Sequence, residues 1–320
     1  MPDSKAIDSI LVQWGDRLFY PGNRVVQRRP TPRLRGDSRS ERAAHIRGRI
    51  QATVVRRSPQ VMVKVTGGGR GMKAIASHFR YISKNGRLEI EDDQGNVSRG
   101  KATLFGLTDD WRYGGSFIGD ESPRREAFNI VLSMPQGTDA LLLQRAVREF
   151  AKAEFGNHKY VTVLHEHQAN PHVHLTVRAE SKDGTRLNPR KADLQRWREL
   201  FAERLRAWGV DAEATRQVTR GVARTYPELW RVKAAADGRL RNPRTHSRGG
   251  AAAAATRDEA QTAWKELAAA LSAANVADDR QLGERVKQFA DAVGSARVPL
   301  SRSLRRNDQP HRDAAADHLR

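Results

Sequence analysis

The sequence predicts an α+β fold that contains an antiparallel hairpin. Segments with the apolar composition of strands alternate with segments whose apolar residues recur at helical spacing. Two strands are separated only by residues 168–171, and so short a loop joins antiparallel neighbours. A chain of 320 residues is long enough for one core domain with appendages.

The strand and helix signals after residue 60 come in a clear order. The elements we expect are a strand at 61–65, a helix at 72–84, a loop at 91–127, a strand at 128–134, a helix at 138–155, hairpin strands at 160–164 and 172–177, and a helix at 191–208. Thr138 can cap the helix that follows it, and Gly156 ends that helix.

The charge of the chain indicates a polyanionic partner. Lys and Arg number 57 against 37 Asp and Glu, which gives a net charge of +20. Nucleic acid is the commonest partner of so basic a protein. We expect no membrane insertion, because no run approaches the length of a membrane span and no signal-peptide core begins the chain. The absence of cysteine agrees with the cytoplasm, although a disulfide-free secreted protein would look the same.

The two ends of the chain are expected to be appendages. Residues 22–57 carry eleven arginines, so we expect residues 1–58 to form a basic, partly disordered arm that grips phosphates; a solubilising tail is the alternative. A basic linker at 213–250, a helical segment at 251–296 and a polar tail at 297–320 are expected to follow. In the helical segment Ala260, Trp264, Leu267 and Leu271 form one apolar stripe, which could pack on the core, dimerise or bind a partner.

Four histidines stand within ten residues at the predicted hairpin. We expect His167 opposite His172 and His165 opposite His174, which would place all four imidazoles on one face of the sheet. The pattern favours a metal site over a merely polar sheet face. Closed structural zinc sites usually contain cysteine, and this chain has none, so an open catalytic site is the preferred interpretation.

A glycine-rich turn precedes the helix at 72–84. Gly67–Gly71 lies between a strand and that helix, so a phosphate contact at the helix N-terminus and a flexible connection are both open interpretations. The pattern is neither a Walker loop nor a dinucleotide fingerprint. Tyr81 lies almost opposite the apolar stripe of the helix, which makes it a candidate nucleophile.

Three segments together resemble the relaxases of the HUH endonuclease superfamily, in the branch that contains the T-DNA border nuclease and the P-type mobilisation relaxases. The segments are Gly67-Gly68-Gly69 leading into residues 79–89 (FRYISKNGRLE), residues 133–139 (SMPQGTD), and residues 170–174 (NPHVH). They occur in the family's order over about residues 60–225.

The resemblance implies a five-stranded antiparallel sheet flanked by helices, within a nuclease domain at 59–212. It implies Tyr81 as the nucleophile and His165, His172 and His174 as ligands of a divalent metal ion, Mg, Mn or Zn. The implied reaction nicks one DNA strand at a transfer origin, which begins conjugative or mobilisation transfer, and leaves the tyrosine joined to the 5′ phosphate. Residues expected to contact DNA are Arg70, Lys73, Arg80 and Lys84.

The implied partners are single-stranded DNA at the transfer origin, accessory proteins of the relaxosome and a type IV secretion coupling protein. The implied location is the bacterial cytoplasm, with passage to a recipient cell alongside the DNA. His167 stands where the family usually has aspartate, so it is interpreted as a base or an extra ligand in a site that is weakened or still active. Rival functions are a DNA-binding accessory protein without catalysis, a rolling-circle replication initiator, a single-strand transposase and a zinc hydrolase of small substrates.

Overall fold

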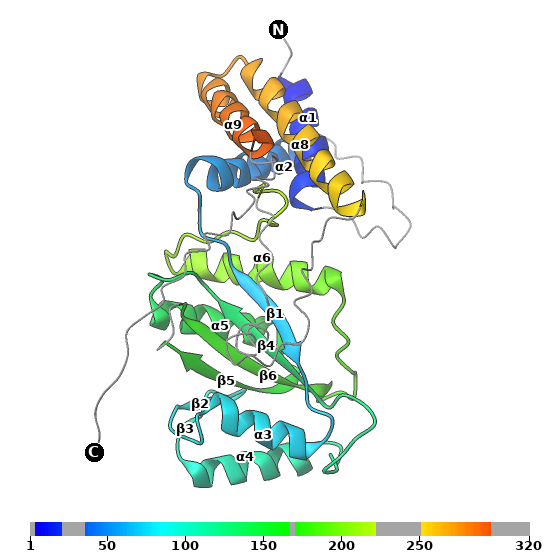
Figure 1. The fold of residues 1–320 in the computed structure, drawn as a ribbon, viewed down its shortest axis with the longest axis vertical. Coiled ribbons are helices and arrows are strands. Elements are labelled where there is room, and N and C mark those ends of the chain that lie inside the picture. The colour runs from blue at the N-terminus through cyan, green and yellow to red at the C-terminus, as the bar shows by residue number, and fades with distance from the viewer. Residues whose placement is uncertain (1–3, 21–35, 167–169, 222–250, 296–320) are drawn as a thin grey trace, which may run out of the picture.

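The computed structural model describes residues 4–20, 36–166, 170–221 and 251–295. Its centre is an antiparallel sheet with strand order β1-β4-β6-β5-β2-β3 (Figure 1). The strands are β1 (Met62–Gly67), β2 (Ile90–Asp92), β3 (Val97–Ser98), β4 (Ala127–Ser133), β5 (His158–His165) and β6 (His172–Ser181). The predicted α+β antiparallel architecture is confirmed, with six strands in place of about five.

The difference in strand number comes from residues 91–127, which the sequence predicts as a loop. Ile90–Asp92 pairs with both β3 and β5 at one edge of the sheet. Strands of two and three residues are too short for alternation to be visible in the sequence. The remainder of that segment includes helix α4 (Lys101–Tyr113), in which Leu104 and Trp111 are buried.

Helices cover both faces of the sheet. On one face lie α5 (Ala140–Phe155) and α6 (Lys191–Ala207), which pack on residues of β6 such as Val173, Leu175 and Val177. The other face is covered by α3 (Met72–Ile82) and α4, whose Phe79 and Trp111 share a core with Val161 and Val163 of β5. Since side chains alternate along a strand, His165 of β5 and His172 and His174 of β6 face the α3 and α4 side.

The N-terminus of α5 is capped one residue later than expected. The Asp139 carboxylate accepts hydrogen bonds from the N–H groups of Leu141 and Leu142. The hydroxyl of Thr138 donates instead to the carbonyl of Pro135. Asp139 therefore satisfies the first-turn donors of the helix, as an N-cap carboxylate does.

A second core, which we call the helical layer, joins the two ends of the chain. It contains α1 (Ser4–Phe19), α2 (Gly36–Ile50), α8 (Ala251–Ser272) and α9 (Ala277–Ser295), and lies at the end of the molecule opposite α3 and α4 (Figure 1). Leu11 of α1, Ile46 of α2 and Trp264 of α8 are buried against one another in this core. The predicted amphipathic stripe of α8 is confirmed, and it packs within the same chain.

The expected basic arm over residues 1–58 is corrected by these helices. The described arginines of α2 are engaged inside the protein rather than free for phosphate: Arg42 pairs with Asp16 at 2.7 Å, and Arg47 pairs with both Asp8 and Asp279 at 2.9 Å. The physical reason is that α1 and α9 pack on α2 and supply the carboxylates with which its arginines pair. Residues 21–35, which hold five of the eleven arginines of residues 22–57, lie outside the described residues.

Arg49 of α2 connects the helical layer to the sheet domain. Its guanidinium lies 2.6 Å from the Glu213 carboxylate, with both side chains buried, and 4.9 Å from the Phe19 ring centroid. The Trp264 indole N–H donates to the carbonyl of Thr219. The described part of the expected linker, residues 213–221, is thus packed between the two cores.

Residues 222–250 lie outside the described residues. Among the helices that the structure describes, none is long and apolar enough to cross a bilayer.

Candidate metal centre and nucleophile

The histidine hairpin has a different register from the one that the sequence predicts. His165, the last residue of β5, is paired with His172, and Val163 is paired with His174. The connection between the strands runs from Glu166 to Pro171, longer than the four-residue loop expected, because β5 stops at His165. The expected pairing of His165 with His174 is therefore wrong, and the position of His167 lies outside the described residues.

Three histidines nevertheless converge, and we call His165, His172 and His174 the triad. Their ring centroids lie 5.0 Å apart for His165 and His172, 4.5 Å for His165 and His174, and 5.2 Å for His172 and His174. One nitrogen from each ring can be chosen so that all three lie within 4.8 Å of one another. This spacing is compatible with three ligands around one metal ion.

Hydrogen bonds to carbonyl groups fix the orientation of two of these rings. His165 Nε2 lies 2.6 Å from the carbonyl oxygen of Ile82, and His172 Nδ1 lies 3.0 Å from that of Asn170. A carbonyl oxygen only accepts, so each of these nitrogens carries the proton in the neutral ring. The lone pairs then belong to His165 Nδ1 and His172 Nε2, the form in which imidazole binds a metal.

The third ring is kept neutral by its surroundings. Burial, followed by the proximity of His165, His172 and His78, lowers the pKa of His174 to about 3. A neutral imidazole is a metal ligand, whereas an imidazolium is not. The residues present thus fit a divalent ion with three nitrogen ligands and open positions for a substrate, as in catalytic zinc or manganese sites.

Tyr81 lies beside the triad, in the last turn of α3. Its side chain is 69% exposed, and its ring centroid lies 6.2 Å from that of His174. The carbonyl that receives the His165 hydrogen bond belongs to Ile82, the next residue along the chain. The C-terminal end of α3 is therefore held against the triad by the same histidine that could bind the metal.

His78 is a neighbour of this site that the sequence analysis does not single out. Its ring centroid lies 6.2 Å from that of Tyr81 and 6.3 Å from that of His174. Burial lowers its pKa to about 4, and its buried Nε2 has no hydrogen-bond partner among the described residues. The signal in the sequence is its position three residues before Tyr81, which places both on one helical face.

The chain directly after Tyr81 is held in an unusual conformation. Lys84 and Asn85 have φ of 51° and 58°, and Gly86 has φ of 80°. The buried hydroxyl of Ser83 donates to the carbonyl of Phe79 and accepts from the N–H of Gly86. Consecutive left-handed residues are rare without glycine, so this turn is maintained by its surroundings.

The glycine-rich turn does not leave the N-terminus of α3 open to a phosphate. The N–H groups of Met72 and Lys73 donate to the carbonyls of Gly119 and Asp120 at 2.9 and 3.2 Å. Gly71, with φ of 95°, allows this close approach, since a Cβ there would lie 2.3 Å from the Asp120 oxygen. The helix N-terminus is thus capped by the chain itself.

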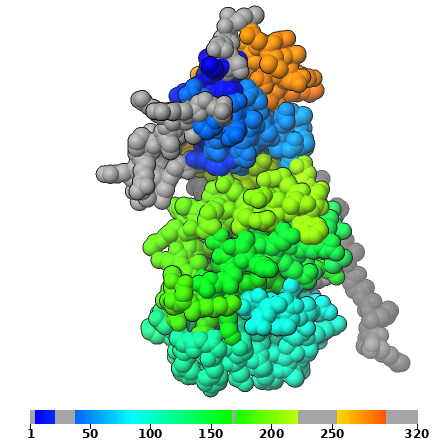
Figure 2. Space-filling view, turned by 180° about the vertical axis from the view of Figure 1, so that it is seen from behind, coloured from blue at the N-terminus to red at the C-terminus, as the bar shows by residue number. Residues whose placement is uncertain are grey.

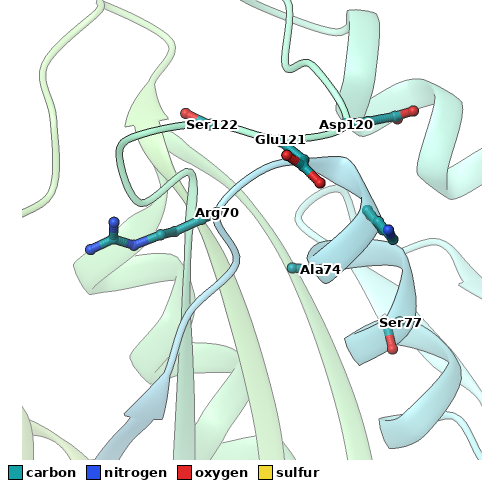
Figure 3. A pocket seen from close by; sticks show the side chains of 7 residues that line it. Arg70, Ala74, Ser77, Asp120, Glu121 and Ser122 are labelled. Carbon is teal, nitrogen blue, oxygen red and sulfur yellow. The ribbon is translucent and has the colours of Figure 1, made fainter.

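An open hollow of about 570 Å³ lies beside this turn (Figure 3). Its lining combines basic and acidic side chains: Arg70, Lys73, Ala74, Ser77, Asp120, Glu121 and Ser122. Figure 3 shows Arg70 pointing away from Ser77, and its guanidinium donates to the carbonyl of Pro123. The contact of Arg70 and Lys73 with DNA stays a prediction.

Comparison with known proteins gives consistent matches. The family described as relaxase, MobA/VirD2-like, nuclease domain, matches residues 118–210, which include the triad but not Tyr81. The T-DNA border endonuclease VirD2 of Rhizobium radiobacter is 25% identical over 203 residues, covering 54% of this chain and 46% of that protein. The VirD2 protein of Agrobacterium fabrum is 24% identical over 198 residues, covering 54% and 44%.

The chain spans about half the length of these relatives. The matched residues contain β5, β6, α5 and α6, the elements that carry the triad and cover the opposite face of the sheet. The antiparallel sheet and the convergent histidines agree with the family that the sequence resembles. Residues 118–210 therefore match the nuclease domain of MobA/VirD2-like relaxases, and the chain is similar to the T-DNA border endonucleases.

Proposed function

We propose that this protein nicks one strand of DNA at a transfer origin and can reseal it through a covalent tyrosine intermediate. The observation that carries the proposal is the position of Tyr81. Its exposed ring has its centroid 6.2 Å from that of His174, which belongs to the triad that can hold a metal ion. The relaxase domain and the similarity to the T-DNA border endonucleases support it.

In the proposed reaction the Tyr81 hydroxyl oxygen attacks the phosphorus of one phosphodiester in line with the bond to the 3′ oxygen. A bond from the tyrosine oxygen to phosphorus forms and the bond from phosphorus to the 3′ oxygen breaks. The phenol loses its proton, and the 3′ oxygen leaves and gains one. The bond energy is retained in the phosphotyrosine, so the same residues can run the step backwards to religate the strand.

The triad would hold the divalent ion through His165 Nδ1, His172 Nε2 and His174. When bound, the ion supplies Lewis acidity at the non-bridging phosphate oxygens. The protein holds Tyr81 near this centre through the His165–Ile82 hydrogen bond. Phenol has an ordinary pKa near 10, so proton removal needs help, and His167 is retained as the proposed base.

The proposed partners follow from this role. They are single-stranded DNA of a transfer origin, contacted by Arg70, Lys73, Arg80 and Lys84, together with relaxosome accessory proteins and a coupling protein of a type IV secretion system. The proposed setting is the bacterial cytoplasm, where transfer of the plasmid strand begins. The net charge of +20 is consistent with a nucleic acid partner.

The test is formation of a covalent adduct on supercoiled plasmid that carries the origin, in the presence of Mn²⁺ or Mg²⁺. We expect relaxed plasmid with protein attached to the 5′ end at the nick. Tyr81→Phe should abolish the adduct, whereas Tyr113→Phe, at an equally exposed tyrosine of α4, should form it at the wild-type rate. A chelator should prevent nicking.

Two results would contradict the proposal. Equal nicking by Tyr81→Phe would remove Tyr81 from the reaction, and cleavage unaffected by chelation would remove the metal. Strongly salt-dependent DNA binding without any adduct would instead indicate an accessory protein that binds DNA without cutting it.

A further inference from the structure

The ends of α3 and α4 nearest to Tyr81 are locked together by backbone contacts. The N–H of Gly100 donates to the carbonyl of Gly86 at 3.0 Å, and a Cβ on Gly86 would lie 2.6 Å from the Gly100 carbonyl carbon. Gly86 is five residues beyond Tyr81, so the contact lies within about 18 Å of the Tyr81 Cα. Both views show α3 and α4 side by side, at the end of the molecule away from the helical layer (Figures 1 and 2).

Four basic side chains surround this contact, Lys84, Arg87, Arg99 and Lys101. All four are exposed, and none has an ion pair or side-chain hydrogen bond among the described residues. One exposed acidic residue, Glu89, lies in the same stretch. Neighbouring cations without counter-charges repel one another, and a bound anion relieves this repulsion. The arrangement is therefore suited to binding a polyanion.

Phe105 adds an aromatic ring to the cluster. It is four residues beyond Lys101 and therefore on the same side of α4, and its side chain is 71% exposed. Large aromatic residues are normally buried, and a flat ring surrounded by cations is the arrangement on which single-stranded bases stack. Double-stranded DNA offers no free base face for such a contact.

The other end of α4 has exposed aromatic rings but not the free cations. Tyr113 and Phe117 are in contact there, with ring centroids 5.8 Å apart. The nearby Arg112 is paired with Asp120 at 2.6 Å, and Asp109 is exposed. The charge distribution therefore distinguishes the Gly86–Gly100 end of α4 from its far end.

We propose that Lys84, Arg87, Arg99, Lys101 and Phe105, the α3–α4 junction, bind the single strand of DNA next to the cleavage position. The basic side chains contact successive phosphates, and Phe105 stacks on a base. The identity of the ligand rests on the proposed nicking function. This surface lies beyond the opposite end of α3 from the glycine-rich turn, where the N–H groups of Met72 and Lys73 are occupied by the carbonyls of Gly119 and Asp120.

The test measures equilibrium binding of a fluorescent single-stranded oligonucleotide of mixed sequence by anisotropy, over a range of salt concentrations. The chain of 320 residues carries Tyr81→Phe in every sample, so that no covalent step contributes. Replacing Arg87, Arg99 and Lys101 together by Gln should reduce the slope of log affinity against log salt by about 2, since each lost phosphate contact on a single strand contributes about 0.7. Phe105→Ala should weaken binding at least about fivefold and leave the slope unchanged.

Matched controls separate the junction from net charge and from exposed aromatic surface in general. Lys265, Arg285 and Lys287 of the helical layer are also exposed, and replacing all three by Gln removes the same charge. Phe117→Ala removes an aromatic ring of similar exposure at the far end of α4. Neither control should change affinity or salt slope as the junction variants do.

Equal loss in the two triple variants would show a general charge effect and overturn the proposed surface. Equal affinities of Phe105→Ala and Phe117→Ala would overturn the stacking contact. The binding assay needs no cleavage, so its outcome is separable from that of the adduct assay. If the wild type forms no adduct while the junction variants still lose binding, the nicking function fails and the single-strand surface stands.

Discussion

The two ends of α3 are built in opposite ways. At the N-terminal end, the N–H groups of Met72 and Lys73 are occupied by carbonyls of the same chain, and Arg70 donates to another carbonyl. At the C-terminal end, Tyr81 is exposed, and the basic side chains beyond it have no partner among the described residues. Hydrogen bonds hold the backbone of this turn in place, while its basic side chains are exposed to solvent.

From this difference we expect a ligand at the C-terminal end of the helix. A glycine-rich turn before a helix is often interpreted as an anion site. Here the lack of a side chain at Gly71 instead lets the turn pack closely against the backbone of residues 119–120. The C-terminal end instead joins the triad through the His165–Ile82 hydrogen bond. Substitutions at the N-terminal end should therefore change stability alone, whereas those at the C-terminal end should also change function.

The largest expected effect on function is from His174→Ala. With two of three ligands left, the affinity for Mn²⁺ measured by calorimetry should fall more than about 100-fold, because even the partners that orient metal ligands contribute 10- to 100-fold. His158→Ala is the control: this histidine lies at the other end of β5, where its Nδ1 bonds the Arg178 carbonyl. Unchanged Mn²⁺ affinity in His174→Ala would exclude the triad as the metal site.

At the N-terminal end of α3, Gly71→Ala should destabilise the protein without changing its metal affinity. Its φ of 95° and ψ of 167° are essentially restricted to glycine, and the new Cβ would meet the Asp120 backbone. We expect a loss of about 3 kcal/mol in the free energy of unfolding by denaturant. Gly95→Ala, at φ of 86° but in open space, should lose less.

If instead Gly71→Ala lowered DNA binding at temperatures where it is folded, the N-terminal end would have a direct role with the ligand. The comparison of the two ends would then be wrong.

The sequence was sufficient for those features that depend on local periodicity. Alternation in β6 places His172 and His174 on the face opposite Val173, as predicted, and Tyr81 stands out because it is off the apolar stripe of its helix. The register of the hairpin was not predictable, since nothing in residues 165–171 shows where β5 stops pairing. His78 was missed because its neighbour His174 is almost a hundred residues away.

The helical layer was missed for a related reason. Helix α2 is rich in arginine and contributes few apolar residues, among them Ala43, Ile46 and Ile50. Their partners, such as Trp264 and Leu267, follow more than 200 residues later. Neither end of the chain shows a complete core on its own, so the sequence indicates an arm where the structure has a packed layer.

At the C-terminal end of α3, Ser83→Ala should cost both stability and activity. The lost hydroxyl leaves the Gly86 N–H buried without its partner, which costs about 1–3 kcal/mol in the free energy of unfolding. Because the same turn positions Tyr81 and Lys84, we also expect slower adduct formation under conditions where the variant remains folded. Ser77→Ala, at an exposed position on the same helix, is the control. A loss of stability with no loss in the rate of adduct formation would show that the turn only caps the C-terminus of α3.

The smallest effect on stability is expected from His78→Phe. The imidazole is neutral because burial lowers its pKa to about 4, and its buried Nε2 has no hydrogen-bond partner among the described residues. Phenylalanine keeps a neutral ring beside both Tyr81 and His174 and removes that nitrogen, so the free energy of unfolding should change by no more than about 1.5 kcal/mol. His78→Ala removes the ring and should lose about 2–4 kcal/mol. If the packing of this ring is what positions Tyr81 beside His174, His78→Phe should form the adduct at nearly the wild-type rate. A slow but fully stable His78→Phe protein would instead assign the nitrogen a part in the chemistry.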